Sequence, residues 1–446
     1  MPISDLLAIG ASGARAYRAA MGAVSENITN ATTEGYNRRT VALGESASSS
    51  ANSILYKPGV AFGGVEVVGI VRQTDSYLDL AARLASSNYE SANARATWLG
   101  NVQTALDDGS LGVGQRLTTM FAAMEKLAAN PTDETLRTNA LFVIEQVNTA
   151  FKQTANDIKS VQDGMSLEAN NEVVALNDAL SRLASTNEAL RRATPGSSNA
   201  AQLLDQRDQA LADIAKRLDV TVSYDDFGTA DVTYNGVKLV DNITSKTFGV
   251  TTNADKTLSF TVDGAATTVP QSGSLSGIAK SAEVARDRLQ ALNNLADQYV
   301  KDMNTWHTGG LTNDDVAGGN ILTMTPGDAT SISMLFTETS KLAVKSTDGR
   351  TNGNLVDITA IRGTGGVENG WTSIIAAHAN LVNATNAEQA AASARNDQAQ
   401  AARSDVSGVD LDREAADLMR LQQAYSGCAR VIQVGKDLLD AILQIV

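Results

Sequence analysis

The sequence contains 446 residues, of which 43% are hydrophobic, 19% charged and 4% aromatic. A chain of this length can bury two or three cores, built mainly from Ala, Leu, Val and Ile because aromatic residues are so few. The formal net charge of -14 argues against partners that select a basic surface, so we expect neither nucleic acid nor an anionic membrane to bind.

Cysteine and histidine are too scarce for the common metal and redox sites. Cys428 is the only cysteine, which excludes an intrachain disulfide, and His307 and His378 lie far apart in the sequence. The N-terminal segment lacks a basic region followed by a continuous apolar core, and no window approaches a membrane span. We therefore expect no metal or other cofactor and no cleaved signal peptide.

The N-terminus begins with a predicted amphipathic helix followed by a turn. One stripe alternates four- and three-residue steps, the spacing of a seam that packs against a partner helix. It consists of Ile3, Leu7, Gly10, Ala14, Tyr17, Met21, Val24 and Ile28. Residues 29–39, TNATTEGYNRR, are rich in Asn, Thr and Gly and predict a helix exit and an extended turn.

The middle of the chain is predicted to be mostly helical with one β-rich insert. Residues 61–72 indicate a strand or extended chain, and apolar spacing from Leu136 to Leu190 predicts one very long helix or two in line. From Val220 the period changes to two, and the Asn235-Gly236 pair is a strong hairpin signal. Residues 220–279 are therefore expected to form a small antiparallel β domain that projects from the helices.

The last forty or so residues predict a second long helix with an apolar seam. Asp410 is the expected N-cap, and Asp412 and Glu414 lie in the first turn, where the helix dipole favours anions. The seam consists of Leu411, Glu414, Leu418, Leu421, Tyr425, Cys428, Ile432, Gly435, Leu439, Ile442 and Val446.

Both ends of the chain thus carry long amphipathic helices that lack a local partner. We expect them to pair with each other, antiparallel if both termini lie at the same end, and with equivalent helices of neighbouring molecules. The alternative is that both pack on the chain's own globular body. The expected fold class is mainly α with an inserted antiparallel β domain (α+β), in an elongated subunit of several domains.

No pattern in the sequence indicates an enzyme. Arg207 and Asp208 are adjacent on a predicted helix and point in different directions, with no nucleophile nearby, so Arg207 is expected to make a structural ion pair beside a core. The glycines at 363, 365 and 366 lack the strand, helix and basic residue of a phosphate-binding loop. Tyr36 and Arg38 belong to residue types that anchor interfaces, so the loop that carries them is a candidate subunit contact.

Three stretches resemble bacterial flagellar axial proteins. Asn27, Ile28, Asn30, Thr33, Gly35, Tyr36 and Arg38 resemble the NNI.N..TPGY.R signature near the N-terminus of rod, hook and hook-associated proteins, with Glu26 and Glu34 in place of the usual Asn and Pro. The C-terminal stretch is similar to the same group at Ser407, Gly408, Val409, Leu411, Asp412, Glu414, Leu418, Gln422, Gln423, Tyr425, Ala429 and Ile432. Between them, the run from Leu203 to Asp208, LLDQRD, resembles the FlgK family of hook-associated proteins.

This resemblance implies a structural subunit at the hook–filament junction, exported by the flagellar type III apparatus and located in the extracellular flagellum. Implied partners are like subunits, the hook protein, the second junction protein (hook-associated protein 3) and a cytoplasmic export chaperone at the C-terminal helix. A hook or rod subunit is the alternative within the group, and a soluble helical binding protein or enzyme with self-packed termini is the alternative outside it.

The resemblance also implies domains and interface residues. The expected domains are 1–55 with 405–446 (inner core), 56–219 with 280–404 (helical body) and 220–279 (outer β domain). The N-terminal interface candidates are Leu7, Tyr17, Met21, Val24, Ile28, Asn30, Gly35, Tyr36 and Arg38. The C-terminal candidates, for assembly or for the chaperone, are Leu411, Leu418, Leu421, Tyr425, Cys428, Ile432, Leu439, Ile442 and Val446.

Overall fold

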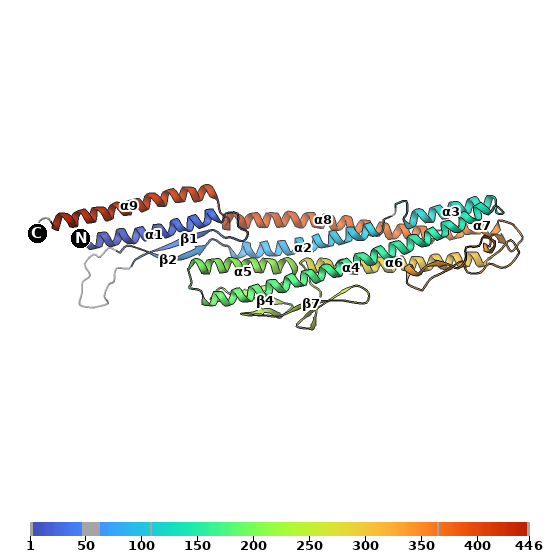
Figure 1. The fold of residues 1–446 in the computed structure, drawn as a ribbon, viewed down its shortest axis with the longest axis horizontal. Coiled ribbons are helices and arrows are strands. Elements are labelled where there is room, and N and C mark those ends of the chain that lie inside the picture. Colours follow the sequence, from blue (N-terminus) through green and yellow to red (C-terminus); the bar gives the residue numbers. More distant parts are fainter. Residues whose placement is uncertain (1–2, 47–62, 108, 364, 444–446) are drawn as a thin grey trace. The chain divides into compact units, whose positions relative to one another are not determined.

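The computed structural model of the protein describes residues 3–46, 63–107, 109–363 and 365–443. The chain divides into two compact units. Unit 1 comprises Met1–Ser87, Ala175–Phe248 and Ala394–Val446, and unit 2 comprises Asn88–Val174 and Gly249–Ser393. Long helices dominate both, accompanied by small antiparallel sheets, which confirms the predicted fold class (Figure 1).

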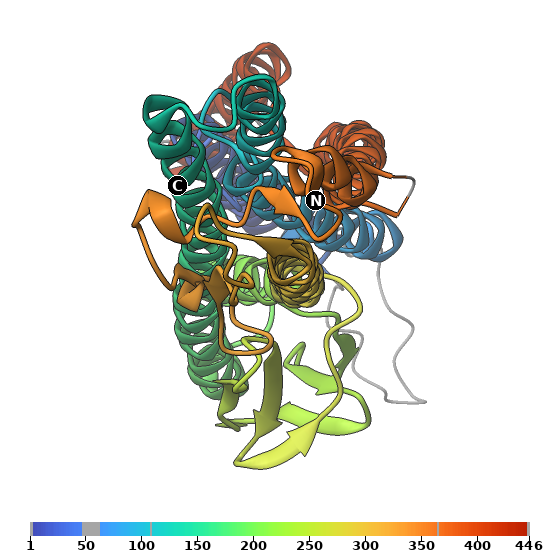
Figure 2. The ribbon, with the colours of Figure 1, turned by 90° about the vertical axis from the view of Figure 1, so that its right-hand side faces the viewer.

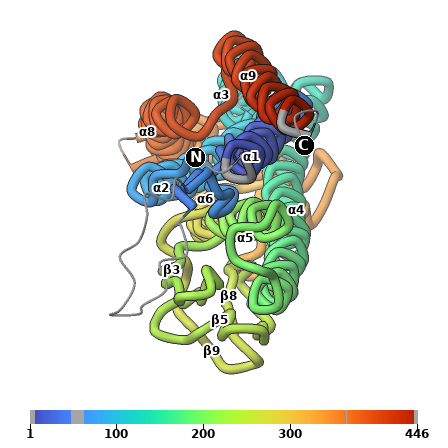
Figure 3. The backbone as a smooth tube through the Cα atoms, turned by 90° about the vertical axis from the view of Figure 1, so that its left-hand side faces the viewer, coloured from blue at the N-terminus to red at the C-terminus, as the bar shows by residue number. Residues whose placement is uncertain are grey.

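The two terminal helices of unit 1 pair with each other. Helix α1 is Ile3–Thr29 and helix α9 is Leu411–Leu443, and they lie side by side in both Figure 1 and Figure 3. Gly435 lies beside Leu7 and Gly10 beside Ile432, so the helices run antiparallel. The predicted pairing of the chain ends is therefore confirmed, and we call α1 and α9 the terminal helix pair.

Unit 1 also contains a pair of antiparallel strands and a helix shorter than the terminal two. Strand β1 (Arg39–Glu45) pairs antiparallel with β2 (Val65–Arg72), with an irregularity between Ala42 and Leu43. Helix α5 (Ser198–Arg217) begins at Ser197, whose hydroxyl accepts a hydrogen bond from the Ala200 amide. The Ile70 amide donates to the Gly196 carbonyl at 2.7 Å, which ties β2 to the turn before α5.

Three long helices contribute residues to both units. They are α2 (Ser76–Ala105), α4 (Glu134–Arg192) and α8 (Val367–Ser407). The sequence left open whether the second of these is one helix or two, and the structure shows a single helix of 59 residues. It starts where the Asp133 carboxylate accepts hydrogen bonds from the Thr135 and Leu136 amides. The predicted cap of α9 is also present, because Asp410 accepts from the Asp412 and Arg413 amides.

The predicted β-rich insert contains two antiparallel sheets. One sheet has the order β3-β4-β5-β6, with strands Thr221–Tyr224, Ala230–Tyr234, Val237–Asp241 and Thr244–Ser245. The other has the order β7-β8-β9, with strands Phe248–Thr252, Leu258–Val262 and Ala265–Thr267. The predicted hairpin turn is confirmed: Asn235 and Gly236 both have positive φ, 47° and 79°. The division between the units follows Phe248, the first residue of β7.

Unit 2 is a helical bundle with a loop-rich region, seen nearly along the helix axes in Figure 2. Its own helices are α3 (Val113–Ala129), α6 (Ser274–Thr308) and α7 (Gly353–Asp357). Its loops contain short strands β10 (Gly310–Leu311), β11 (Leu322–Thr323), β12 (Ser333–Met334) and β13 (Lys345–Ser346), and 3-10 turns Ala329–Ser331, Thr339–Lys341 and Ile358–Arg362.

Buried polar residues of α4 and α6 hold these loops. The Arg137 guanidinium donates to the carbonyls of Pro131 and Thr339. His307 Nδ1 lies 2.6 Å from the Gly319 carbonyl, and its Nε2 accepts from the Ala343 amide at 3.0 Å. Burial lowers the pKa of His307, so the ring is neutral and satisfies both contacts. The two histidines thus have packing roles, since His378 also bonds to a backbone carbonyl, that of Leu99.

Two glycines of α1 differ in how closely other atoms approach them, so we expect substitutions there to have opposite effects on stability. A Cβ on Gly10 would lie 2.8 Å from Ile432 Cγ1 and 3.3 Å from the Cys428 carbonyl oxygen, whereas a Cβ on Gly22 would meet no atom within 4 Å. Gly10→Ala is therefore expected to destabilise the terminal helix pair by about 1–3 kcal/mol through overpacking. Gly22→Ala is expected to stabilise it by up to about 1 kcal/mol through helix propensity.

Amide hydrogen exchange across α1 measures both effects, because faster exchange reports easier opening of the helix. Equal exchange in the two variants would show that the close approach at Gly10 is unimportant for the terminal helix pair.

Candidate assembly interface

The interface between α1 and α9 contains only part of the predicted seam. Val24 is buried, and Leu7 is half-buried against Gly435. Ile432 and Cys428 face Gly10 and Gly13 of α1. The other half-buried candidates are Tyr17, Met21, Ile28, Leu418 and Leu421.

Several predicted residues of α9 stay exposed to solvent. Leu411 is 53% exposed, Tyr425 39% and Leu439 42%. Ile442 belongs to α9 but its side chain is not described, and Val446 lies outside the described residues. The stripe that the sequence treated as one seam is therefore only partly covered within the chain.

A second apolar edge of α9 was missed by the sequence argument. Val431, Val434 and Leu438 are 36%, 54% and 46% exposed, and their three- and four-residue steps place them along one line of the helix. We call these three residues the outer edge. The same heptad spacing could have revealed it, but the polar residues between them, such as Gln433 and Lys436, hid the pattern.

The loop after α1 closes onto the end of that helix through Asn27. This side chain is completely buried, and its Oδ1 accepts from the Tyr36 hydroxyl at 2.8 Å and the Arg39 amide at 2.9 Å. Its Nδ2 donates to the Arg39 carbonyl and to Glu414 Oε2, both at 2.9 Å. All hydrogen-bonding capacity of this asparagine is thus used to hold the loop and α9.

Arg38 links the loop directly to α9. Its Nε lies 2.6 Å from Glu414 Oε1 and its Nη2 3.3 Å from Asp417 Oδ2. Its backbone amide donates to the Ser407 carbonyl at 2.8 Å, just before α9 begins. The N-terminal and C-terminal signatures, far apart in the chain, therefore meet in space. We call the contacts among Asn27, Arg38 and Glu414 the terminal latch.

The LLDQRD run of α5 anchors the same loop from the other side. Asp205 accepts from Asn37 Nδ2 at 2.7 Å and pairs with Arg39 Nη2 and Arg72 Nε, each at 2.8 Å. All three sequence regions that carried the family resemblance thus contribute to one buried polar cluster. Its guanidinium and carboxylate groups neutralise each other, which burial requires.

Asp208 forms the second half of this cluster and confirms a structural role for Arg207. Arg207 Nη2 lies 2.6 Å from Asp208 Oδ1, although the two residues are adjacent on the helix, because the long arginine side chain bends back. Arg207 also stacks on the Tyr224 ring, 4.7 Å from its centroid. Arg72 pairs with the other Asp208 oxygen. Adjacent helix positions point apart, as expected, but the arginine side chain is long enough to reach its neighbour.

The cluster shifts two ionisation equilibria. Burial raises the pKa of Tyr36 to about 12, against a smaller opposing effect of Arg39, so the phenol stays protonated and can donate to Asn27. Burial alone would raise the pKa of Asp208, but Arg207 and Arg72 outweigh it and hold the pKa below its ordinary value. The carboxylate therefore stays ionised under neutral conditions.

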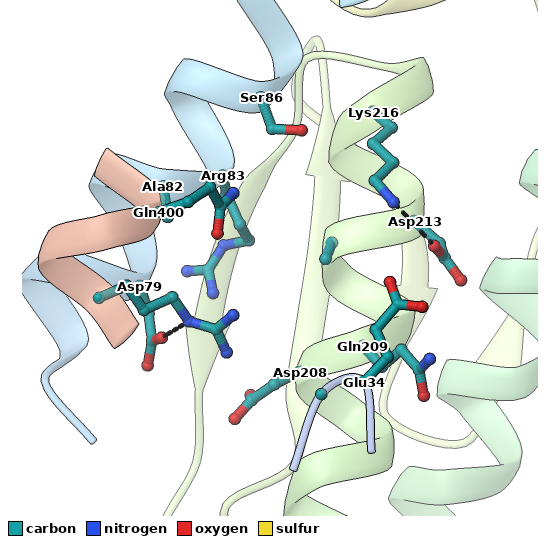
Figure 4. Close-up of a pocket in the computed structure, with 13 residues that line it drawn as sticks. Glu34, Asp79, Ala82, Arg83, Ser86, Asp208, Gln209, Asp213, Lys216 and Gln400 are labelled. Atoms are coloured by element: carbon teal, nitrogen blue, oxygen red, sulfur yellow. Dashed lines mark hydrogen bonds and ion pairs between the residues drawn. The ribbon is translucent and has the colours of Figure 1, made fainter. Parts of the chain in front are cut away.

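Three cavities adjoin this loop. Glu34, Asp79, Asp208 and Asp213 line one of about 200 Å³ together with residues of α2, α5 and α8 (Figure 4). Arg403 pairs with Asp79 there, and Lys216 with Asp213. Two further hollows, of about 660 Å³ and 420 Å³, share Gly35 of the loop. Among the described residues, no three His, Cys, Asp or Glu side chains form a group that could hold a metal ion.

None of the described helices combines the length and hydrophobicity needed to cross a membrane. The protein is therefore helical with paired ends. The buried polar cluster described above connects segments of the same chain. That the candidate residues contact a neighbouring subunit stays a prediction.

Comparison with known proteins gives the family. Residues 99–322 match the family model described as the flagellar hook-associated protein FlgK helical domain, and residues 402–445 match the C-terminal region of flagellar basal body rod FlgEFG proteins. The chain belongs to the FlgK family of flagellar hook-associated proteins.

Relatives and a solved structure agree with this family. The chain is 28% identical over 330 residues to flagellar hook-associated protein 1 of Salmonella typhimurium, across 71% of this chain and 59% of that protein. It is 23% identical over 486 residues to the Bacillus subtilis protein of the same name, across 96% of this chain and 95% of that protein. The flagellar hook junction protein FlgK from Burkholderia pseudomallei matches the fold with a TM-score of 0.65 and 13% identity, over 72% of this chain and 98% of that one.

The chain thus spans 59% of the length of the Salmonella relative, and the same holds for that of Escherichia coli.

The low pKa of Asp208 predicts how the stability of the fold depends on pH. Asp208→Asn removes one partner of a buried ion pair and is expected to destabilise the fold by about 3–5 kcal/mol at pH 7. Because the folded pKa lies below the ordinary value of 3.8, this contribution is complete above about pH 5 and is lost as the pH falls through the folded pKa. The stability difference between the native protein and the variant should therefore narrow only below about pH 4.

Urea unfolding followed by circular dichroism, from pH 7 to pH 3, measures this difference. Asp213→Asn is the control, because Asp213 pairs with Arg182 at the surface and its loss should change stability little. A difference that narrows already near pH 6, or persists unchanged at pH 3, contradicts the account.

Proposed function

We propose that this chain is a structural subunit of the bacterial flagellum, at the junction between hook and filament. The observation that carries the proposal is the match of residues 99–322 to the FlgK helical domain. A hook or rod subunit would share the C-terminal match at residues 402–445, but the helical-domain match favours the junction. In this proposal the chain is not an enzyme and uses no cofactor.

The proposed mechanism is assembly through the terminal helix pair. Helix α1 covers one side of α9, and the outer edge of Val431, Val434 and Leu438 is left in water. Contact with a neighbouring copy would bury this edge, and binding to the folded form alone stabilises that form. Leu411, Tyr425 and Leu439, also exposed, extend the surface available to a neighbour or to a chaperone.

We further propose an indirect role for Tyr36 and Arg38 of the loop at residues 29–39. Tyr36 and Arg38 are engaged within the chain, with Asn27 and Glu414. The side chains left for a neighbour are those of Thr32, Thr33 and Glu34, which are exposed. We therefore propose that Tyr36 and Arg38 shape the interface by positioning the loop and α9.

We propose the export route, the location and the partners that membership of the family implies. The chain would leave the cytoplasm through the flagellar type III apparatus without a cleaved signal peptide and function in the extracellular flagellum. Its partners would be like subunits, the hook protein and hook-associated protein 3, with an export chaperone on the C-terminal helix before assembly. Neither nucleic acid nor a membrane is a proposed partner, in keeping with the net charge of -14.

Charged substitutions on α9 test the assembly mechanism. Val434→Asp on the outer edge is expected to leave the monomer's stability within about 0.5 kcal/mol, because the side chain is exposed, and to abolish incorporation into flagella. Ile432→Asp faces α1 and is expected to destabilise the terminal helix pair as well.

Ser426→Asp provides the matched control, because it introduces the same charge at an exposed position outside both faces. Incorporation is measured by immunoblotting of purified flagella and by swimming in cells that carry only the variant. Normal flagella with Val434→Asp would contradict assembly through the outer edge.

A further inference from the structure

The packing between α1 and α9 does not by itself specify one alignment. The α1 side is apolar and contains two glycines, Gly10 and Gly13, that lie against Ile432 and Cys428. Apolar contacts of this kind carry no polar group that a shifted α9 would leave unpaired. Sliding α9 by one heptad, about seven residues, restores the same seam spacing. In one such alignment Gly435 would lie opposite Gly13 and Cys428 opposite Ala20, which again sets small side chains against each other.

The terminal latch is the polar interruption of this apolar seam. Glu414 is completely buried, and its two carboxylate oxygens bond to Asn27 Nδ2 at 2.9 Å and Arg38 Nε at 2.6 Å. After the heptad shift Leu421 would face Asn27, and both Asn27 and Arg38 would lose their carboxylate. A buried polar group or charge without its partner costs several kcal/mol, far more than a change of apolar neighbours.

We propose that the terminal latch is a register lock: it selects one antiparallel alignment of α9 on α1 from several that the apolar seam permits. A single buried polar pair fixes alignment in coiled coils by the same physical principle. The latch thereby determines where along α1 the outer edge is presented. The lock acts within the isolated chain and does not depend on assembly.

A disulfide reports the native alignment directly. A Cβ on Gly13 would lie 3.8 Å from the Cys428 Cβ, which is the usual separation in a disulfide. Gly13→Cys should therefore cross-link to Cys428 in the native alignment. Ala20→Cys should cross-link to Cys428 only after α9 has shifted by one heptad, with its first turns unwound to provide the slack.

Moving the carboxylate tests the lock in the full-length chain. Glu414→Leu with Leu421→Glu places the carboxylate one heptad further along α9, where only the shifted alignment brings it to Asn27 and Arg38. We expect the cross-link after mild oxidation to move from Gly13→Cys to Ala20→Cys, with the ratio of the two yields changing at least tenfold. Peptide mapping by mass spectrometry identifies the linked cysteines.

The control is Glu414→Gln, which keeps a hydrogen-bonding partner for Asn27 and should retain the Gly13→Cys cross-link. Glu414→Leu alone should give both cross-links, because no alignment then satisfies the latch. Retention of the Gly13→Cys cross-link alone in the exchanged variant overturns the proposal and assigns the alignment to side-chain packing or to the short link before α9. Loss of both cross-links in that variant also overturns it, because the carboxylate would then be unable to select an alignment.

Discussion

The buried Glu414 carboxylate is the constraint on which the ends of this chain depend. A completely buried charge is tolerated only where donors surround it, and its donors are Asn27 and Arg38, from the opposite end of the sequence. The first helix, the loop that follows it and the last helix must therefore all be in place together. This requirement couples the two termini more specifically than the small and aliphatic seam between them could.

Buried carboxylates of α5 are likewise paired with residues from a distant part of the chain. Asp205 and Asp208 pair with Arg39 of β1 and Arg72 of β2, which face each other in the register, so both strands are held at the same end of the hairpin. Because each carboxylate serves more than one guanidinium, removal of either would leave positive charge without compensation. In unit 1 the charged residues of the family signatures thus need one another, because each neutralises a buried charge of the others. The exposed part of α9 is what remains for contact with another molecule.

Periodicity and turn residues predicted the helices and the Asn235-Gly236 hairpin, because these depend on local sequence. The pairing of the ends was predicted because each terminal helix carries an apolar stripe without a local partner. The sequence could not reveal that Arg38 reaches Glu414 or that Asp205 joins the same cluster, since these contacts join residues 376 and 168 positions apart. It also assigned one apolar stripe to α9, whereas α1 covers only part of it. The outer edge escaped notice because its apolar residues are interspersed with charged ones.

A terminal helix covered on one side is suited to a subunit that completes its packing only among its neighbours. The most direct measurement is amide hydrogen exchange along α9 in the monomer and in the assembled structure. The account predicts protection near Glu414 in both states, and protection from Val431 to Leu438 that rises strongly on assembly, because neighbouring copies then cover the outer edge. Equal protection of Val431 to Leu438 in the monomer and the assembly would contradict it.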